Sequence, residues 1–139
     1  MALLKFHIPK TNTRTTENRR VALELGKTGE RLAEKYLTDK GYIVIERNYH
    51  QGHLEIDLIA LDKDELVIVE VKTRAHDNVL QPEEAVDHKK RLSLIRLANE
   101  YVRSHGRQEN VRFDVVSIVS NGDHTEINHI ENAFNIFSF

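Results

Sequence analysis

Two short apolar segments joined by a charged turn restrict the fold of this 139-residue chain more than any other feature. Residues 54–61 and 66–73 are rich in apolar and β-branched side chains, which is typical of strands. The residues between them, 62–65, are all charged and have the length of a hairpin turn. Near this turn both faces of the predicted hairpin are apolar, as in a sheet that is covered on both sides.

Counting outward from this turn gives the expected pairing of the two strands. Asp57 then lies opposite Glu70, and Glu55 lies opposite Lys72. Because side chains alternate along a strand, we expect all four side chains on one face. Like charges placed opposite each other destabilise a sheet, and partial burial adds to that cost unless a carboxyl group takes up a proton or a cation binds.

A divalent metal ion resolves this repulsion directly. Mg²⁺ prefers oxygen ligands and commonly uses one or two carboxylates together with substrate phosphate and water. Lys72 beside these carboxylates would orient or deprotonate the attacking water, which is the chemistry of metal-assisted phosphodiester hydrolysis. The alternative is a cross-strand ion pair between Glu55 and Lys72, with Asp57 and Glu70 reaching solvent. Acidic residues embedded in otherwise apolar strands favour the metal site.

Periodicity and turn residues define the remaining elements. We expect a flexible arm over 1–16, a helix over about 19–39, a strand over 42–47, a loop over 48–52, a helix over about 84–105, a strand over 111–119, a turn at 121–123 and an edge strand over 125–139. This order predicts one α/β domain, residues 17–139, built as a sandwich around a mixed sheet. Gly26 and Gly29 weaken the first helix, which indicates close packing against a neighbour.

Glu30 is a further candidate carboxylate on the first predicted helix. It precedes Ala33 by three residues and Leu37 by seven, so it borders the apolar stripe of that helix. From this position it either leans over the sheet toward the other acids or stays in water. The spacing alone leaves both alternatives open.

Composition sets limits on the function. With 40% apolar and 30% charged residues, the chain has the composition of a soluble globular protein, and the lack of cysteine excludes disulfides and thiolate metal sites. We expect a cytoplasmic protein, since no apolar stretch approaches the length of a membrane span. The net charge of −2 argues mildly against nucleic-acid binding, but basic residues gather in the first twenty residues and in 89–107. Either group alone is also explained as a solvated face.

Two other sets of polar residues favour structural interpretations. The eight histidines show no metal-binding spacing, and we expect them to be exposed or to lie in loops. Arg112 and Asp114 alternate with apolar residues on a predicted strand. They form a structural ion pair or touch the substrate, and we favour the structural role.

The strand motifs Glu55-Ile56-Asp57-Leu58-Ile59 and Val69-Glu70-Val71-Lys72-Thr73 resemble the core of the PD-(D/E)xK nuclease superfamily. The ordered set of further motifs resembles the YraN-like uncharacterised protein family: Gly29-Glu30, Gly41-Tyr42, Arg47-Asn48, Ala85-Val86 with Lys89, Arg112-Phe113-Asp114 and His129-Ile130. This resemblance implies a restriction-endonuclease-like three-layer sandwich, with a mixed sheet flanked by helices. Leu54 departs from the pattern, because a glycine usually precedes the Glu-Ile-Asp motif.

The resemblance also implies roles for particular residues. Asp57 and Glu70 would bind Mg²⁺ or Mn²⁺, and Lys72 would assist the water. Similarity to archaeal Holliday-junction resolvases adds Glu30 to the metal ligands and allows a homodimer. Glu55 would support the metal ligands without binding the ion.

We therefore expect a metal-dependent endonuclease-like protein acting on DNA, branched or damaged DNA included. The residues expected to contact nucleic-acid phosphates are Lys89, Lys90, Arg91 and Arg47, together with the basic arm. The alternative is a non-catalytic nucleic-acid-binding or protein-interaction module, because a fold does not by itself imply its usual activity.

Overall fold

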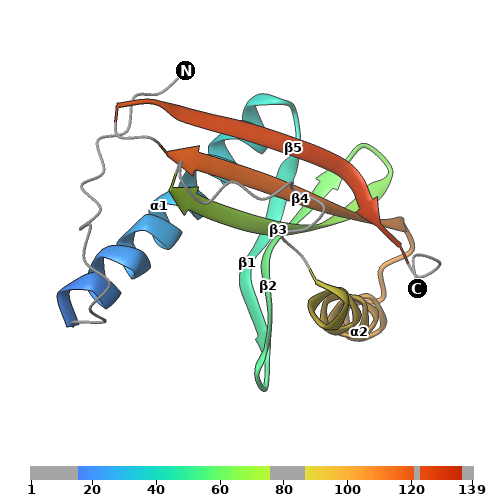
Figure 1. The fold of residues 1–139 in the computed structure, drawn as a ribbon. Coiled ribbons are helices and arrows are strands. Elements are labelled where there is room, and N and C mark those ends of the chain that lie inside the picture. The colour runs from blue at the N-terminus through green and yellow to red at the C-terminus, as the bar shows by residue number, and fades with distance from the viewer. Residues whose placement is uncertain (1–15, 76–86, 121–122, 136–139) are drawn as a thin grey trace.

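Five strands and two helices build a three-layer α/β sandwich in the computed structural model, which describes residues 16–75, 87–120 and 123–135 (Figure 1). The elements are α1 (Thr16–Asp39), β1 (Ile43–Gln51), β2 (Leu54–Asp62), β3 (Glu65–Ala75), α2 (His88–His105), β4 (Asn110–Ser120) and β5 (Thr125–Phe134). The strands form one sheet in the order β1-β2-β3-β4-β5. Only β3 and β4 are parallel, and the other neighbours are antiparallel. The predicted mixed sheet flanked by helices is confirmed.

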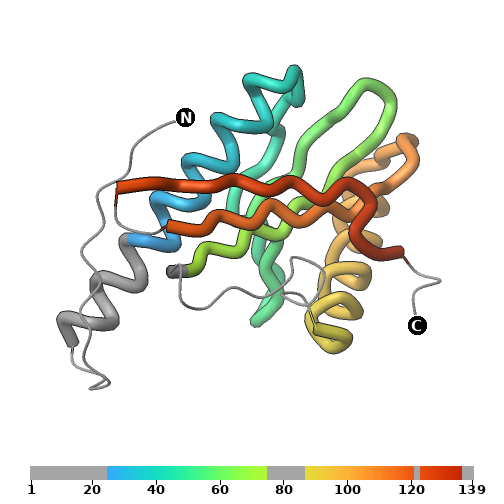
Figure 2. The backbone as a smooth tube through the Cα atoms, turned by 45° about the horizontal axis from the view of Figure 1, so that its top comes forward, coloured from blue at the N-terminus to red at the C-terminus, as the bar shows by residue number. Residues whose placement is uncertain are grey.

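Each helix covers one face of this sheet with its own apolar cluster (Figure 2). The cluster on the α1 side contains Ala33, Leu37, Tyr42, Leu58, Ala60, Val67, Val69, Val116 and Ile118. The cluster on the α2 side contains Ile56, Ile59, Leu66, Ile68, Leu94, Leu97, Ala98, Tyr101, Phe113, Val115 and Phe134. Burial on both faces explains why the central strands are apolar on both sides near the β2–β3 turn.

Helix α1 ends as its glycine predicts. Gly41 has φ +97°, and its N–H donates to the Thr38 carbonyl at 3.0 Å. The next N–H, of Tyr42, donates to the Leu37 carbonyl at 3.0 Å, which completes a Schellman motif. This termination turns the chain sharply into β1. The arm expected over 1–16 lies outside the described residues, except that Thr16 is the first residue of α1.

The close packing predicted from the two helix glycines occurs at only one of them. A Cβ atom added at Gly29 would lie 2.0 Å from Oγ1 of Thr73 on β3, whereas one added at Gly26 would meet no atom of the described residues within 4 Å. Gly29 therefore lets α1 approach β3 more closely than any other residue would allow.

Strand β1 is longer than predicted. Residues 48–51, expected in a loop, continue the strand, because they pair with β2 as far as Gln51 opposite Leu54. A tight turn with Gly52 at φ +61° joins the two strands. Asn48 keeps its place in the strand with a left-handed φ of +50°, a conformation that asparagine tolerates.

The second helix begins later than predicted. Asp87 is the N-cap, and its side chain accepts a hydrogen bond from the Lys90 N–H at 2.8 Å, so the helix starts at His88 rather than at residue 84. Its buried residues are Leu94, Leu97, Ala98 and Tyr101, while Leu92 is exposed. Residues 76–86 and the turn residues 121–122 lie outside the described part of the chain. No described helix is long and apolar enough to cross a membrane.

Candidate functional site

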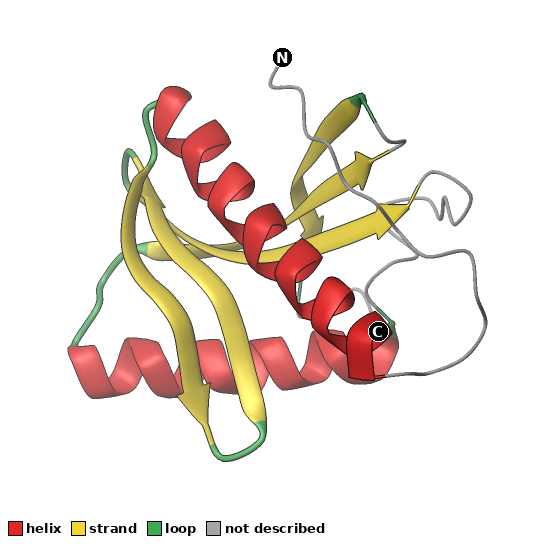
Figure 3. Cartoon of the chain, turned by 90° about the vertical axis from the view of Figure 1, so that its left-hand side faces the viewer, coloured by secondary structure: helices red, strands yellow, loops and turns green. Residues whose placement is uncertain are grey.

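The candidate site lies where β2 separates from β3. The two strands pair with the predicted register from Asp62 opposite Glu65 to Leu58 opposite Val69. Beyond Leu58 the β1–β2 hairpin turns away from the rest of the sheet, as the two long strands in the lower left of Figure 3 show. The pairs expected further out, Asp57 with Glu70 and Glu55 with Lys72, are therefore not ladder pairs. Strand twist, which counting along the sequence ignores, separates β2 from β3 at this point. We call the opening between the two strands, at Glu55 and Asp57 on β2 and Glu70 and Lys72 on β3, the acidic fork.

Asp57 spans this fork through its side chain. Its Oδ2 accepts a hydrogen bond from the Val71 N–H at 2.8 Å. A side-chain carboxylate thus satisfies a backbone donor of β3 just past the last paired residues. This contact fixes Asp57 to β3 although its own strand has diverged.

Three carboxylates meet at the fork, one from α1 and two from β2. Glu30, Glu55 and Asp57 each place one carboxylate oxygen within 4.8 Å of the others. Glu30 follows Gly29 directly, so the close approach of α1 to Thr73 also brings this glutamate over the sheet. Glu30 therefore leans over the sheet toward the other acids instead of staying in water, the two alternatives that its spacing in the sequence left open. Glu55, predicted to support the metal ligands without binding the ion, is one of these three carboxylates, whereas the predicted ligand Glu70 is not.

Glu70 lies deeper, with its side chain only 5% exposed. Its Oε1 is 3.5 Å from Lys72 Nζ and 3.8 Å from Lys90 Nζ. Its Oε2 is buried and has no hydrogen-bond partner among the described residues. A buried carboxylate oxygen without a donor is costly, so this atom marks a position for a cation or a proton.

The crowding of acids shifts their proton affinities upward. Burial, and then the Asp57 charge, raises the pKa of Glu70 to about 7, while Lys90 and Lys72 oppose this shift. Burial is also the main cause that raises the pKa of Asp57, despite the hydrogen bond from Val71. The pKa of Glu30 is raised by burial first and then by Asp57 and Glu55. The site therefore resists full ionisation unless positive charge enters it.

The basic residues expected to contact phosphates have different surroundings. Lys89 is exposed in the first turn of α2, while Lys90 from the same turn reaches Glu70. The Arg91 guanidinium lies 5.5 Å from the centroid of the Phe134 ring. Arg47 is held by a two-pronged hydrogen bond and ion pair to Glu34 of α1, which ties the hairpin to that helix. Phosphate binding by these four residues stays a prediction.

Sequence reasoning did not place two side chains that enter this site. Lys90, predicted to contact phosphate, also lies beside Glu70. The sequence does not predict this contact, because it does not show the direction of α2 relative to β3. The sequence predicts no role for Asn48 beyond its place in the Arg47-Asn48 motif, yet its amide nitrogen, directed at the acids, reaches Glu30 and Glu55. The one local signal for Asn48 was its residue type, which favours left-handed backbone.

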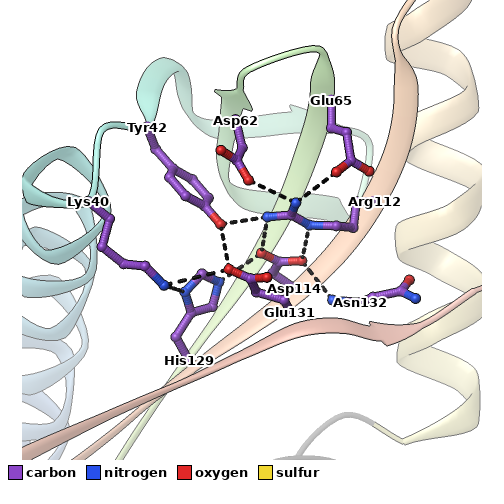
Figure 4. A network of polar contacts seen from close by, with 9 residues as sticks. All are labelled: Lys40, Tyr42, Asp62, Glu65, Arg112, Asp114, His129, Glu131 and Asn132. Atoms are coloured by element: carbon purple, nitrogen blue, oxygen red, sulfur yellow. Dashed lines mark hydrogen bonds and ion pairs between the residues drawn. The ribbon is translucent and has the colours of Figure 1, made fainter.

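A second polar network lies on the sheet away from the fork (Figure 4). Arg112 donates to Asp114 through Nε at 2.9 Å and also contacts Asp62 and Glu65 at the β2–β3 turn. The prediction that histidines are exposed or lie in loops is wrong for His129, because it lies on β5 and its side chain is 1% exposed. Its Nε2 lies 2.7 Å from Asp114 Oδ2. These contacts join β2, β3, β4 and β5, in agreement with the structural role favoured for Arg112 and Asp114.

Comparison with known proteins agrees with the motifs. The model of the Uncharacterised protein family UPF0102 matches residues 29–118, a segment that runs from Gly29 on α1 into β4. The chain belongs to this family. The predicted YraN-like family is thereby confirmed. The part of this chain that matches UPF0102 contains every carboxylate and lysine of the fork.

Similar proteins named UPF0102 protein occur in several bacteria. The relative from Bacteroides thetaiotaomicron is 43% identical over 111 residues, which cover 80% of this chain and 92% of the relative. The relative from Parabacteroides distasonis is 44% identical over 111 residues, with the same coverage of 80% and 92%. The relative from Syntrophomonas wolfei is 46% identical over 112 residues, covering 80% of this chain and 97% of the relative.

Proposed function

We propose that this UPF0102 protein is a Mg²⁺- or Mn²⁺-dependent nuclease that hydrolyses phosphodiester bonds in DNA, branched or damaged DNA included. The observation that carries the proposal is the acidic fork. Glu30, Glu55 and Asp57 converge within 4.8 Å of one another, and the charge of Asp57 acts on Glu70, whose Oε2 is buried and has no hydrogen-bond partner among the described residues. Lys72 completes the set 3.5 Å from Glu70.

The donor set fits a hard divalent cation. Such ions take carboxylate oxygens, and Glu30, Glu55 and Asp57 offer three of them within 4.8 Å of one another. Glu70, which feels the charge of Asp57, would add a fourth. Binding would neutralise like charges that burial makes costly and would satisfy the unpartnered oxygen of Glu70. When bound, the ion would supply Lewis-acid polarisation of the phosphate and lower the pKa of a coordinated water.

The chain's own groups account for the other requirements of the reaction. Asp57 is fixed to β3 by its hydrogen bond from Val71, so it holds its position as the substrate enters. Lys72 and Lys90 both lie beside Glu70 Oε1, where their charge balances the acids. We assign Lys72 to orienting the water, and the exposed Lys89 to phosphate contact that adds affinity without sequence preference.

A cleavage assay with matched asparagine variants tests this proposal. Mn²⁺ is titrated into wild type, Asp57→Asn and Asp64→Asn, and each protein is assayed on linear, flapped and four-way DNA. Asp64 is exposed in the turn at the opposite end of the β2–β3 hairpin, so its variant controls for loss of one acidic charge. We expect Asp57→Asn to lose at least about 100-fold in cleavage rate and Asp64→Asn to keep the wild-type rate.

Two results contradict the proposal in different ways. Wild type that binds no Mn²⁺ at millimolar concentration excludes the metal-dependent enzyme and favours the non-catalytic module. Cleavage that survives Asp57→Asn at full rate shows that a contaminating nuclease is responsible.

A further inference from the structure

Asn48 has a backbone conformation that is unusual inside a strand. Its φ of +50° lies in the left-handed region, which asparagine and glycine tolerate better than other residues do. Its neighbours Arg47 and Tyr49 lie opposite Leu58 and Ile56, so Asn48 occupies the position opposite Asp57. The side chain therefore starts from the edge of the acidic fork.

The amide of Asn48 joins two elements of the candidate site. With its nitrogen directed at the acids, Nδ2 donates to Glu55 Oε1 at 3.0 Å and to Glu30 Oε2 at 3.2 Å. The two hydrogens of one NH₂ group thus serve carboxylates from β2 and α1. Hydrogen bonds to ionised acceptors are stronger than those between neutral groups. They oppose the repulsion that otherwise pushes the two glutamates apart.

We propose that Asn48 is a positioning residue that clamps Glu30 to Glu55 and so preforms the metal centre. The role in metal binding rests on the proposed function, whereas the clamp itself does not. Glycine would adopt the left-handed backbone at this position equally well. The backbone conformation therefore does not explain why the residue carries an amide side chain. Removing a group that orients metal ligands through hydrogen bonds typically lowers metal affinity by about 10- to 100-fold.

The chain offers a matched control for this test. Asn132 on β5 has nearly the same backbone conformation, with φ +51°, but belongs to the second polar network, where its backbone N–H donates to Asp114. Asn48→Gly and Asn132→Gly therefore make the same chemical change on the same type of backbone. Mn²⁺ affinity is measured for both variants by electron paramagnetic resonance, with thermal unfolding to confirm that each is folded.

We expect Asn48→Gly to weaken Mn²⁺ binding by at least about 10-fold and Asn132→Gly to leave it unchanged. Cleavage by Asn48→Gly should recover toward the wild-type kcat at saturating Mn²⁺, because the ligands themselves remain. A general loss of structure would not show this split between metal affinity and kcat. Unchanged Mn²⁺ affinity in folded Asn48→Gly overturns the positioning role.

A metal-free measurement separates the clamp from the proposed function. In the ¹H–¹⁵N spectrum without metal, the side-chain NH₂ signals of Asn48 should move in Glu55→Gln, while those of Asn132 should not. Signals of Asn48 that do not respond to Glu55→Gln refute the clamp. Responding signals in a protein that binds no Mn²⁺ support the clamp and overturn only the proposed function.

Discussion

Replacing Glu70 by glutamine should stabilise the metal-free protein while removing its response to metal. Glu70 is a buried carboxylate whose pKa is raised from 4.5 to about 7 by burial and by the Asp57 charge. An acid with a raised pKa in the folded state is ionised there at a cost that the unfolded chain does not bear. Glutamine keeps the shape of the side chain and removes that cost.

The size of the effect follows from the pKa difference. The change from 4.5 to about 7 corresponds to about 3 kcal/mol of destabilisation at pH 8, where the folded-state carboxyl is ionised. Lys72 and Lys90 lose their partner in the variant, and both are partly exposed, so their contribution is screened. We expect a net gain of about 1–2 kcal/mol, which raises Tm by about 3–8 °C for a domain of this size.

The pH dependence has a defined sign. Below pH 4.5 the carboxyl is protonated in both the folded and the unfolded chain, so the variant gains nothing there. The gain grows as the pH rises from 4.5 to about 7 and is complete above that value. Thermal unfolding of both proteins in EDTA at pH 5 and pH 8 measures this difference.

Metal should reverse the order of stability. A ligand at 100 times its Kd stabilises the folded state by about 2.7 kcal/mol, so Mn²⁺ at or above that concentration should raise the Tm of wild type above that of Glu70→Gln. A variant that is less stable than wild type at pH 8 in EDTA, or whose gain is the same at both pH values, refutes the electrostatic reasoning.

Two further changes test the packing of α1 and the second polar network. Gly29→Ala should destabilise the protein by about 1–3 kcal/mol in urea unfolding, because its Cβ would lie 2.0 Å from Thr73 Oγ1, whereas Gly26→Ala should stabilise it by up to about 1 kcal/mol. Equal effects of the two glycine substitutions would contradict the close contact. Asp114→Asn should cost about 3–5 kcal/mol, because it leaves the buried Arg112 without its main counter-charge. Burial opposes ionisation of Asp114, but hydrogen bonds from His129, Arg112 and the Asn132 N–H outweigh it and lower its pKa, so this contribution should be present above about pH 4 and lost as the pH falls further. An Asp114→Asn protein as stable as wild type at pH 7 would show that the network is dispensable.

The sequence by itself determined the features that depend on neighbouring residues. The charged turn and the alternation around it fixed the β2–β3 register near Leu58 and Val69, because turn length and side-chain period act locally. Gly41 ended α1 for the same kind of reason, since a left-handed residue closes a helix within its last turn. The acidic and basic residues of the motifs also identified the family, because their order and spacing are properties of the sequence alone.

Only the tertiary structure decided which of these residues meet. Glu30 joins Asp57 because Gly29 lets α1 approach Thr73, a contact between residues far apart in the chain. The divergence of β2 from β3 replaced the expected Asp57–Glu70 pair with a fork, and Asn48 and Lys90 entered it from β1 and α2. Twist and helix packing set these distances, and both arise from the sum of many contacts across the sheet rather than from any local pattern.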